Sequence, residues 1–482
     1  MVFSSPIFLF VFLPLTVVFY YLTGKNYRNY VLLFASLVFY CWGEFKFLPL
    51  LLAVVLVNYV AALLLAHLDH QAALPDSKRQ IRRKLVLAGC VTVNLLVLSF
   101  FKYANFLLEN LNILRHGLGI APLSFPQVTL PLGISFFTFH ALSYTIDVYR
   151  RTSKPQTSFF SLALYIALFP QLIAGPIVRY HDVNQQLTKR KHSLTLFVSG
   201  IQRFIIGLAK KVLIANTMAT VANRCFALSG EQVFPGLIWL GLISYTMQIY
   251  YDFSGYSDMA IGLAKMFGFR FWENFNYPYS SLSIQEFWRR WHISLSSWFR
   301  DYLYIPLGGN RGSELRTYFN LCLVFFLCGL WHGASWNFLL WGLYHGFFLV
   351  CERAFLGACL LRLPRLARNV YAMIVVVIGW LIFLSPDLAH IALYSKALLG
   401  LYRGQVEEIT VPMLLSNEFL LMFCVGAVFS FPWLESWWKK QSSRYSLQAK
   451  FIMEWSMLFV VFVLALARLC ASTYNPFIYF RF

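Results

Sequence analysis

The sequence contains few charged residues. Of its 482 residues, Asp, Glu, Lys and Arg together account for 12%, whereas hydrophobic residues account for 59%. A water-soluble domain carries roughly 25% charged residues, because its surface must be covered by groups that water solvates. A chain with half that share cannot cover so large a surface and needs an apolar solvent. The composition therefore excludes a soluble fold and predicts an integral membrane protein surrounded by lipid.

Acidic residues are scarcer still. The chain has 20 Asp and Glu against 40 Lys and Arg, which gives a net charge of +20. In a soluble protein this excess would favour nucleic-acid binding. Here the basic residues cluster between apolar segments, as in the cytoplasmic loops of membrane proteins. We therefore expect no nucleic-acid partner.

Cysteine and histidine motifs of metal sites are missing. The nine cysteines include no CxxC pair, most of them lie inside apolar runs, and no HExxH motif occurs. A cysteine in an apolar run usually behaves as a small hydrophobic residue. We therefore expect neither a disulfide framework nor a metal site.

Long apolar runs are what the sequence has in abundance. They begin at residues 7–22, which have no positive segment before them and no small-residue cleavage site after them, so we expect this run to be retained as a span. Some runs are shorter than a bilayer requires, and we expect about 11 to 14 membrane helices, some of them partial or re-entrant. The fold class is then an all-α polytopic membrane protein. No internal repeat or long soluble linker interrupts it, so residues 1–482 are predicted to form one membrane domain.

Basic residues between the runs predict the orientation. Lys25 and Arg28 follow the first run, a dense basic cluster at 78–84 follows the third, and another basic group lies at 189–191. Lys and Arg are enriched in cytoplasmic loops. This alternation predicts a periplasmic N-terminus and cytoplasmic basic segments, although the same clusters can also bind anionic lipid headgroups.

One segment, 287–304, suits neither lipid nor water. It alternates bulky aromatic residues with charges, including Arg289, Arg290, Arg300 and His292. Because each charge at membrane depth is costly, we expect the segment to form a helix that is buried in protein or lines a cavity. In one continuous helix, His292 would share a face with the residues four positions before and after it. A buried histidine bonded to a neighbour is the plain structural alternative.

His332 stands inside a strongly apolar segment, in the sequence Gly-Leu-Trp-His-Gly. Ionisable residues at membrane depth are candidates for function, and imidazole is the natural general base near neutral pH. The alternative is a histidine bonded to a backbone carbonyl between helices. His345 repeats the pattern more weakly, and His140 and His390 are interpreted as structural.

Two carboxylates, Asp252 and Asp258, lie in a segment that is otherwise fit to span the membrane. They can orient a histidine, pair with Arg300, or bond hydroxyl groups. Structural pairing and a supporting role in catalysis both remain open at this point.

These segments together resemble the membrane-bound O-acyltransferase (MBOAT) superfamily, and within it the bacterial branch that O-acetylates polysaccharides such as alginate and peptidoglycan. The resemblance extends over most of the chain, and its motifs occur in order. They are residues 1–5, 131–135, 146–150, 174–176, 252–258, 287–292, 300–304, 308–312 and 329–333, and the C-terminal segment 475–482 is also similar to the family.

The resemblance implies a ring of helices around a deep funnel, with the catalytic helices at roughly 250–350. It implies transfer of acetyl groups across the bacterial inner membrane from a cytoplasmic donor, with acetyl-CoA as the expected acyl-donor substrate and no permanently bound cofactor. It also implies that His332 is the catalytic histidine and His292 its companion. A periplasmic acetyltransferase partner and a polysaccharide acceptor complete the expected system.

The chemistry needs an acyl donor, a base and stabilisation of charge. His332 can take the proton of an incoming hydroxyl, or can itself be transiently acetylated, and the sequence does not separate these two mechanisms. Arg300 or Asn337 can stabilise the oxyanion. Arg289 and Arg290 can bind the phosphates of the donor, since guanidinium suits phosphate, or can simply anchor the cytoplasmic face.

Two other functional classes compete with this hypothesis. A transporter has the same composition, but transporters often show inverted repeats, and this sequence has none. A scaffold that passes acetyl groups to a separate periplasmic enzyme would not need His332. A third alternative stays within the superfamily and transfers a long acyl chain or a D-alanyl group.

Overall fold

The computed structural model describes residues 1–71, 75–405 and 409–471, and these residues form helices and loops without any strand. The C-terminal segment 475–482 lies outside the described residues. A helix bonds all of its backbone groups within its own segment, which is what a spanning segment in lipid requires. The prediction of an all-α polytopic protein is confirmed.

The backbone divides into two compact units, which are described separately. Unit 1 comprises Met1–Ile201 and Ala260–Trp272, and unit 2 comprises Gln202–Met259 and Glu273–Phe482. Unit 1 contains η1 (Phe8–Phe12), α1 (Leu13–Leu22), η2 (Lys25–Tyr27), α2 (Arg28–Glu44), η3 (Phe45–Phe47), α3 (Leu48–His70), α4 (Asp76–Gly117), α5 (Ile134–Tyr149), α6 (Phe159–Ala167), α7 (Phe169–Leu172) and α8 (Tyr180–Thr188).

Two long helices, α9 (Leu194–Ala209) and α11 (Pro235–Met266), contribute residues to both units. The remaining elements belong to unit 2. They are η4 (Lys210–Ala215), α10 (Asn216–Phe226), η5 (Gly230–Gln232), η6 (Pro278–Ser280), α12 (Ile284–Arg290), α13 (Ile293–Phe299), η7 (Arg300–Tyr304), α14 (Glu314–His332), α15 (Trp336–Cys351), η8 (Glu352–Leu356), α16 (Gly357–Leu361), α17 (Arg365–Leu384), α18 (Leu388–Leu398), α19 (Val411–Leu414), α20 (Asn417–Phe429), α21 (Trp433–Ser442) and α22 (Leu447–Ala471).

Several of the described helices are long and apolar enough to span a membrane. Within the described residues there are 7 such stretches, or up to 8 if the bent pair of α20 and α21 is one span. The predicted 11 to 14 helices include partial ones, and shorter apolar helices are present as well, such as Phe8–Leu22 and α6, which has 9 residues. The stretches are Lys25–His70, Asp76–Gly117, Leu194–Phe226, Glu314–His332, Trp336–Leu361, Arg365–Leu384 and Leu447–Ala471.

Large apolar side chains cover the outer faces of these helices. Leu96 on α4 is 64% exposed and Phe459 on α22 is 67% exposed. Apolar surface of this kind cannot face water in a monomeric soluble protein. It is the surface that a lipid bilayer covers.

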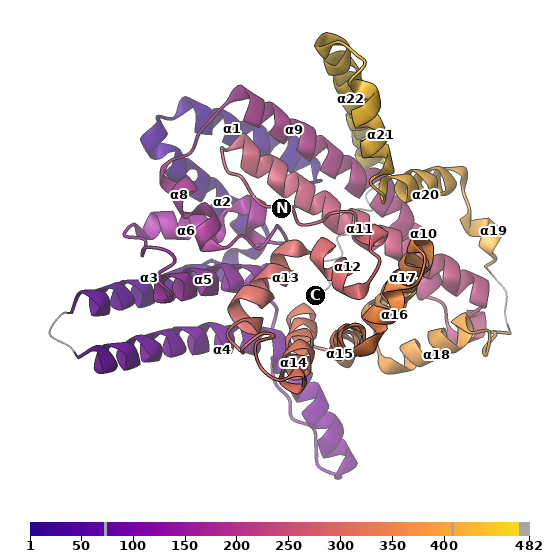
Figure 1. Ribbon diagram of the computed structural model, residues 1–482, viewed down its shortest axis with the longest axis horizontal. Coiled ribbons are helices and arrows are strands. Elements are labelled where there is room, and N and C mark those ends of the chain that lie inside the picture. Colours follow the sequence, from indigo (N-terminus) through magenta and orange to yellow (C-terminus); the bar gives the residue numbers. More distant parts are fainter. Residues whose placement is uncertain (72–74, 406–408, 472–482) are drawn as a thin grey trace. The chain divides into compact units, whose positions relative to one another are not determined.

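In unit 1, helices α3, α4 and α5 pack side by side (Figure 1). Polar side chains bond between them: Asn58 donates to Asn94 Oδ1 at 3.0 Å, and Thr145 donates to Asn58 Oδ1 at 2.7 Å. Buried amides and hydroxyls commonly join membrane helices in this way. The basic cluster at 78–84, predicted to lie in a loop, is instead the first part of α4.

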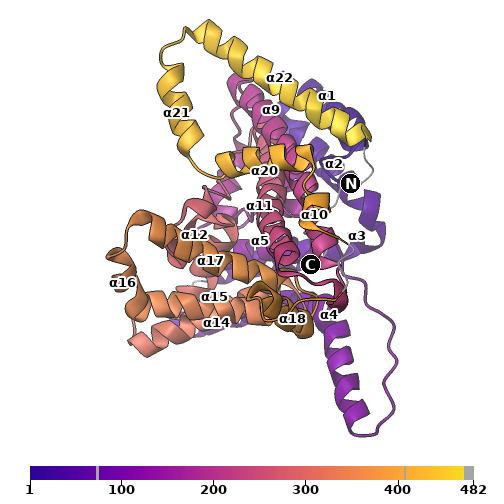
Figure 2. The ribbon, with the colours of Figure 1, turned by 90° about the vertical axis from the view of Figure 1, so that its right-hand side faces the viewer.

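In unit 2, helices α14, α15 and α17 pack side by side (Figure 2). Helix α12 and the tryptophan that follows it bury large rings against this group. Trp291 lies 4.8 Å from Trp380 of α17, and Trp288 lies 5.6 Å from Trp341 of α15, measured between ring centroids. The prediction that this charged aromatic segment is buried in protein is confirmed for its aromatic rings.

Candidate active site

His332 is the last residue of α14 and is buried. Three rings surround its imidazole: those of Trp331, Trp341 and Phe383, with centroid distances of 5.0, 4.9 and 5.3 Å. The latter two rings come from α15 and α17. An aromatic wall excludes water from the imidazole, and a proton acceptor in such a site acts in a medium of low dielectric constant.

Two glycines bring the backbones of α14 and α15 into contact and so fix the end of α14. A Cβ atom on Gly329 would lie 2.3 Å from the carbonyl oxygen of Phe338, and one on Gly342 would lie 2.3 Å from that of Phe325. No real Cβ approaches a backbone oxygen so closely. Glycine is therefore required at both positions, as in other close helix contacts within membranes.

We expect Gly342→Ala to force α14 and α15 apart and to displace His332. The clash is with backbone, which cannot rotate away, so the cost should reach the upper part of the range for overpacking, about 1–3 kcal/mol. Thermal unfolding of the purified protein in detergent measures the loss of stability, and the acyl transfer that the family resemblance implies measures the displacement of His332. Gly346→Ala is the matched control, since a Cβ there meets its nearest atom at an ordinary 3.4 Å. Equal behaviour of the two variants would show that close packing at Gly342 is unimportant.

His292 does not lie within a continuous helix, so the prediction of a shared face with Trp288 and Ser296 is wrong. Helix α12 ends at Arg290, and α13 begins at Ile293. Between them His292 adopts a left-handed backbone conformation with φ of 42°. Few residues other than glycine do so, and the conformation persists only where surrounding bonds enforce it.

Asn274 provides those bonds. Its Oδ1 atom accepts hydrogen bonds from the backbone N–H of Ser294 at 3.1 Å and from the Ser294 hydroxyl at 2.8 Å, and its backbone carbonyl accepts from the N–H of Ile293. The N–H donor identifies the amide oxygen. His292 Nδ1 lies 3.2 Å from the same oxygen, so Nδ1 carries the proton and Nε2 the lone pair.

The structure brings the two predicted histidines together around one side chain. The Trp331 ring lies 6.1 Å from that of His292 and 5.0 Å from that of His332. Both imidazoles are buried. A pair of buried imidazoles beside one indole can accept and release a proton, and it combines the two residues that the sequence singled out most strongly.

Asp252 and Asp258 form ion pairs with residues that precede them in the chain. Asp252 Oδ1 lies 2.6 Å from Lys211 Nζ, and Asp258 accepts from Arg203 Nε at 2.8 Å and from Lys210 Nζ at 2.7 Å. Both carboxylates are buried on α11, and all three cations lie on the α9–η4 helix. These contacts favour structural pairing for the two carboxylates.

Of the alternatives for these carboxylates, pairing with Arg300 is wrong, because Arg300 binds its neighbour Asp301, with Nε 2.7 Å from Oδ1. Arg300 also lines a cavity of about 170 Å³ together with Trp288, Leu295, Ser296, Phe299, Tyr304, Leu321, Val324, Phe325 and Cys328. Cys328 precedes His332 by one helical turn on the same face of α14.

The other predicted residues lie on α12 and at the start of α15. Arg289 is exposed, and Arg290 forms a salt bridge with Glu286 at 2.8 Å. Asn337 donates to the carbonyl oxygen of Ser385 at 2.9 Å and accepts from the hydroxyl of Ser335. Asn337 thereby joins the start of α15 to the end of α17.

Sequence reasoning missed several residues of this site. Asn274 lies in an irregular loop and carries no pattern that marks it. Lys211 did carry a signal, because a cation in the middle of an apolar run is costly unless it is paired. His345 was noted only as a weaker candidate, and it is fully buried between Trp288 and Trp341, with both ring centroids 5.1 Å away.

Comparison with known proteins identifies the family. Residues 38–395 match MBOAT, the membrane-bound O-acyltransferase family. The chain belongs to the MBOAT family. It is therefore a membrane acyltransferase, as its resemblance to the superfamily implied.

Relatives of this MBOAT chain include proteins named for O-acetylation. A probable alginate O-acetylase AlgI of Azotobacter vinelandii is 48% identical over 388 residues, which cover 80% of this chain and 76% of the relative. A probable alginate O-acetylase AlgI of Pseudomonas putida is 41% identical and matches over 100% of both chains. A peptidoglycan O-acetyltransferase of Helicobacter pylori is 37% identical, over 83% of this chain and 80% of its own length.

Proposed function

We propose that this MBOAT protein transfers acetyl groups from a cytoplasmic donor, acetyl-CoA, across the inner membrane for the O-acetylation of an exported polysaccharide such as alginate or peptidoglycan. The observation that carries the proposal is the end-to-end match with a probable alginate O-acetylase. The buried pair of histidines beside Trp331 supports the proposal, because these are the two residues to which the family resemblance assigns the chemistry.

In the proposed reaction, His332 acts as general base. Its ring nitrogen takes the proton of the acceptor hydroxyl while the hydroxyl oxygen attacks the thioester carbonyl. The C–O bond forms, the C–S bond breaks, and the thiolate leaves with a proton returned by the imidazolium. Such a base contributes a rate factor on the order of 10²–10⁴. His292, whose Nε2 carries the lone pair, assists this proton transfer from the other side of Trp331.

The cavity lined by Arg300 supports a short acyl group. Its volume of about 170 Å³ equals that of only a few water molecules, and large rings form much of its wall. An acetyl group fits such a space. Arg300 stabilises charge there, and the exposed guanidinium of Arg289 with the neighbouring Arg290 binds phosphates of the donor.

The proposed topology follows from the basic segments. Lys25, Arg28 and residues 189–191 face the cytoplasm, where acetyl-CoA is available, and the N-terminus is periplasmic. The hydroxyl that receives the acetyl group at His332 belongs to a periplasmic acetyltransferase partner, which then completes the transfer to the polysaccharide. The two buried carboxylates, Asp252 and Asp258, and Asn337 stabilise the fold of unit 2.

We expect cells that lack the gene to lose O-acetyl esters from one envelope polysaccharide while producing the same amount of that polymer. Mass analysis of alginate and of peptidoglycan fragments, before and after mild alkaline removal of esters, measures the loss and names the acceptor. Complementation with the intact gene should restore the esters. Unchanged acetylation of every envelope polysaccharide would refute the proposed function.

A further inference from the structure

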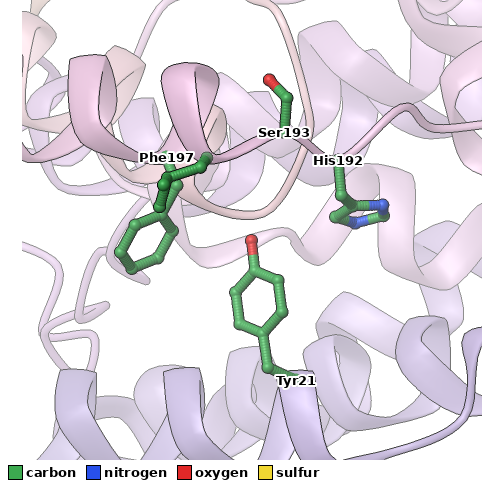
Figure 3. A pocket seen from close by; sticks show the side chains of 5 residues that line it. Tyr21, His192, Ser193 and Phe197 are labelled. Atoms are coloured by element: carbon green, nitrogen blue, oxygen red, sulfur yellow. The ribbon is translucent and has the colours of Figure 1, made fainter.

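Unit 1 contains an open pocket that the proposed reaction does not use. It has a volume of about 380 Å³ and is lined by Tyr21, His192, Ser193, Leu194 and Phe197. Figure 3 shows Tyr21 extending from α1 toward the segment that carries His192 and Ser193, with the Phe197 ring on its other side. The wall is mostly apolar, because rings and an aliphatic side chain form it, and a histidine lies at its edge.

Hydrogen bonds fix the residues around this pocket. His192 Nε2 lies 2.7 Å from the hydroxyl of Tyr20, and the Tyr20 hydroxyl donates to the carbonyl oxygen of Phe267 at 2.9 Å. The Tyr21 hydroxyl donates to the carbonyl oxygen of Met266 at 2.6 Å. A pocket whose wall is held in this way is formed before any ligand arrives.

Two guanidinium groups lie close to these rings. The Arg28 guanidinium is 5.2 Å from the Tyr20 ring centroid and 5.3 Å from that of Tyr21. Arg190 donates to the Tyr20 hydroxyl at 3.3 Å and to Asn29 Oδ1 at 2.6 Å. The two basic segments that the sequence placed on the cytoplasmic side, one after the first apolar run and one at 189–191, therefore meet at this pocket.

The charges that act on His192 at this pocket are positive. Burial lowers the pKa of His192, and the positive charges of Arg28, Arg190 and Lys25 lower it further. Among the described residues, none of these three cations takes part in a salt bridge, although exposed cations elsewhere, such as Arg151 and Lys439, do. Unbalanced positive charge beside an apolar wall at the membrane surface attracts an amphipathic anion.

We propose that this pocket binds an anionic phospholipid of the cytoplasmic leaflet. Its phosphodiester lies between Arg28, Arg190 and His192, and the start of an acyl chain lies along Tyr21, Leu194 and Phe197. Guanidinium groups bind phosphate oxygens in a fixed, forked geometry. The apolar wall distinguishes a lipid from a free phosphate, because a free phosphate has no apolar surface to bury against it.

The experiment is native mass spectrometry of the full chain in detergent, titrated with phosphatidylglycerol, with zwitterionic phosphatidylethanolamine and with inorganic phosphate. The intact protein should retain phosphatidylglycerol in preference to the other two. Each cation near a membrane surface changes anionic lipid binding roughly fivefold. The double variant Arg28→Gln and Arg190→Gln should therefore bind phosphatidylglycerol about 25-fold more weakly.

The matched control removes two exposed cations from another basic segment of unit 1, with Arg82→Gln and Lys84→Gln, and should leave binding unchanged. Because Arg190 also bonds within the protein, the single variant Arg28→Gln is measured as well and should weaken binding about fivefold. Equal weakening by the control pair would mean that only net charge matters and would overturn the site. Equal retention of phosphatidylethanolamine, or binding of inorganic phosphate in place of the lipid, would also overturn it.

Discussion

Replacing His332 by alanine is expected to reduce O-acetylation in cells by a factor on the order of 10²–10⁴, the contribution of a positioned general base. The residue ends α14 within a wall of three aromatic rings, where water cannot substitute for the lost imidazole. His332→Gln keeps most of the side-chain volume but provides no base, so it should be as inactive as the alanine variant. Acetyl esters released from the polymer by alkali are the measurement.

A second buried histidine provides the control for damage to folding. His140 is fully buried on α5 of unit 1, and His140→Ala removes a buried side chain of the same size from another helix. We expect this variant to keep its acetylation activity if it accumulates to a comparable level in the membrane. Full activity of the His332 variants would instead favour a scaffold that only recruits a periplasmic enzyme, and it would refute catalysis by His332.

Properties that depend on composition and local pattern were predictable from the sequence. The small fraction of charged residues predicts an integral membrane protein, because composition is a property of the whole chain and does not depend on how it folds. His332 could be found because an ionisable residue within an apolar run is costly wherever the run folds. The same argument, applied to the run around Lys211, would have found a buried cation that must have a partner.

Properties that depend on distant contacts were not predictable in this way. The left-handed conformation of His292 results from hydrogen bonds to Asn274, which lies in a loop without any local signal. A helical period continues through residues 288–296, so a pattern alone predicts one helix where the structure has two. The pairing of Arg190 with Tyr20 likewise joins segments that no periodicity relates.

The buried ion pair of Lys211 and Asp252 leads to the largest expected effect on stability. Each side chain is only 2% exposed, and Lys211 Nζ also donates to Asn216 Oδ1 at 3.0 Å. Removing one member of such a pair leaves the other charge buried without this counter-charge, which costs about 3–5 kcal/mol. We therefore expect Lys211→Met to lower the thermal unfolding midpoint in detergent by several degrees.

The adjacent lysine tests whether burial of the ion pair causes the loss of stability. Lys210 bonds to Asp258, but its side chain is 27% exposed, and Asp258 retains Arg203 when the lysine is removed. Lys210→Met should therefore cost at most about 1 kcal/mol, as for a partly solvated pair. Adding Asp252→Leu to Lys211→Met removes both charges and replaces them with apolar groups, so it should recover most of the lost stability. Equal losses of stability for the two lysine variants, or no recovery in the double variant, would show that the buried carboxylate of Asp252 is not the source of the loss.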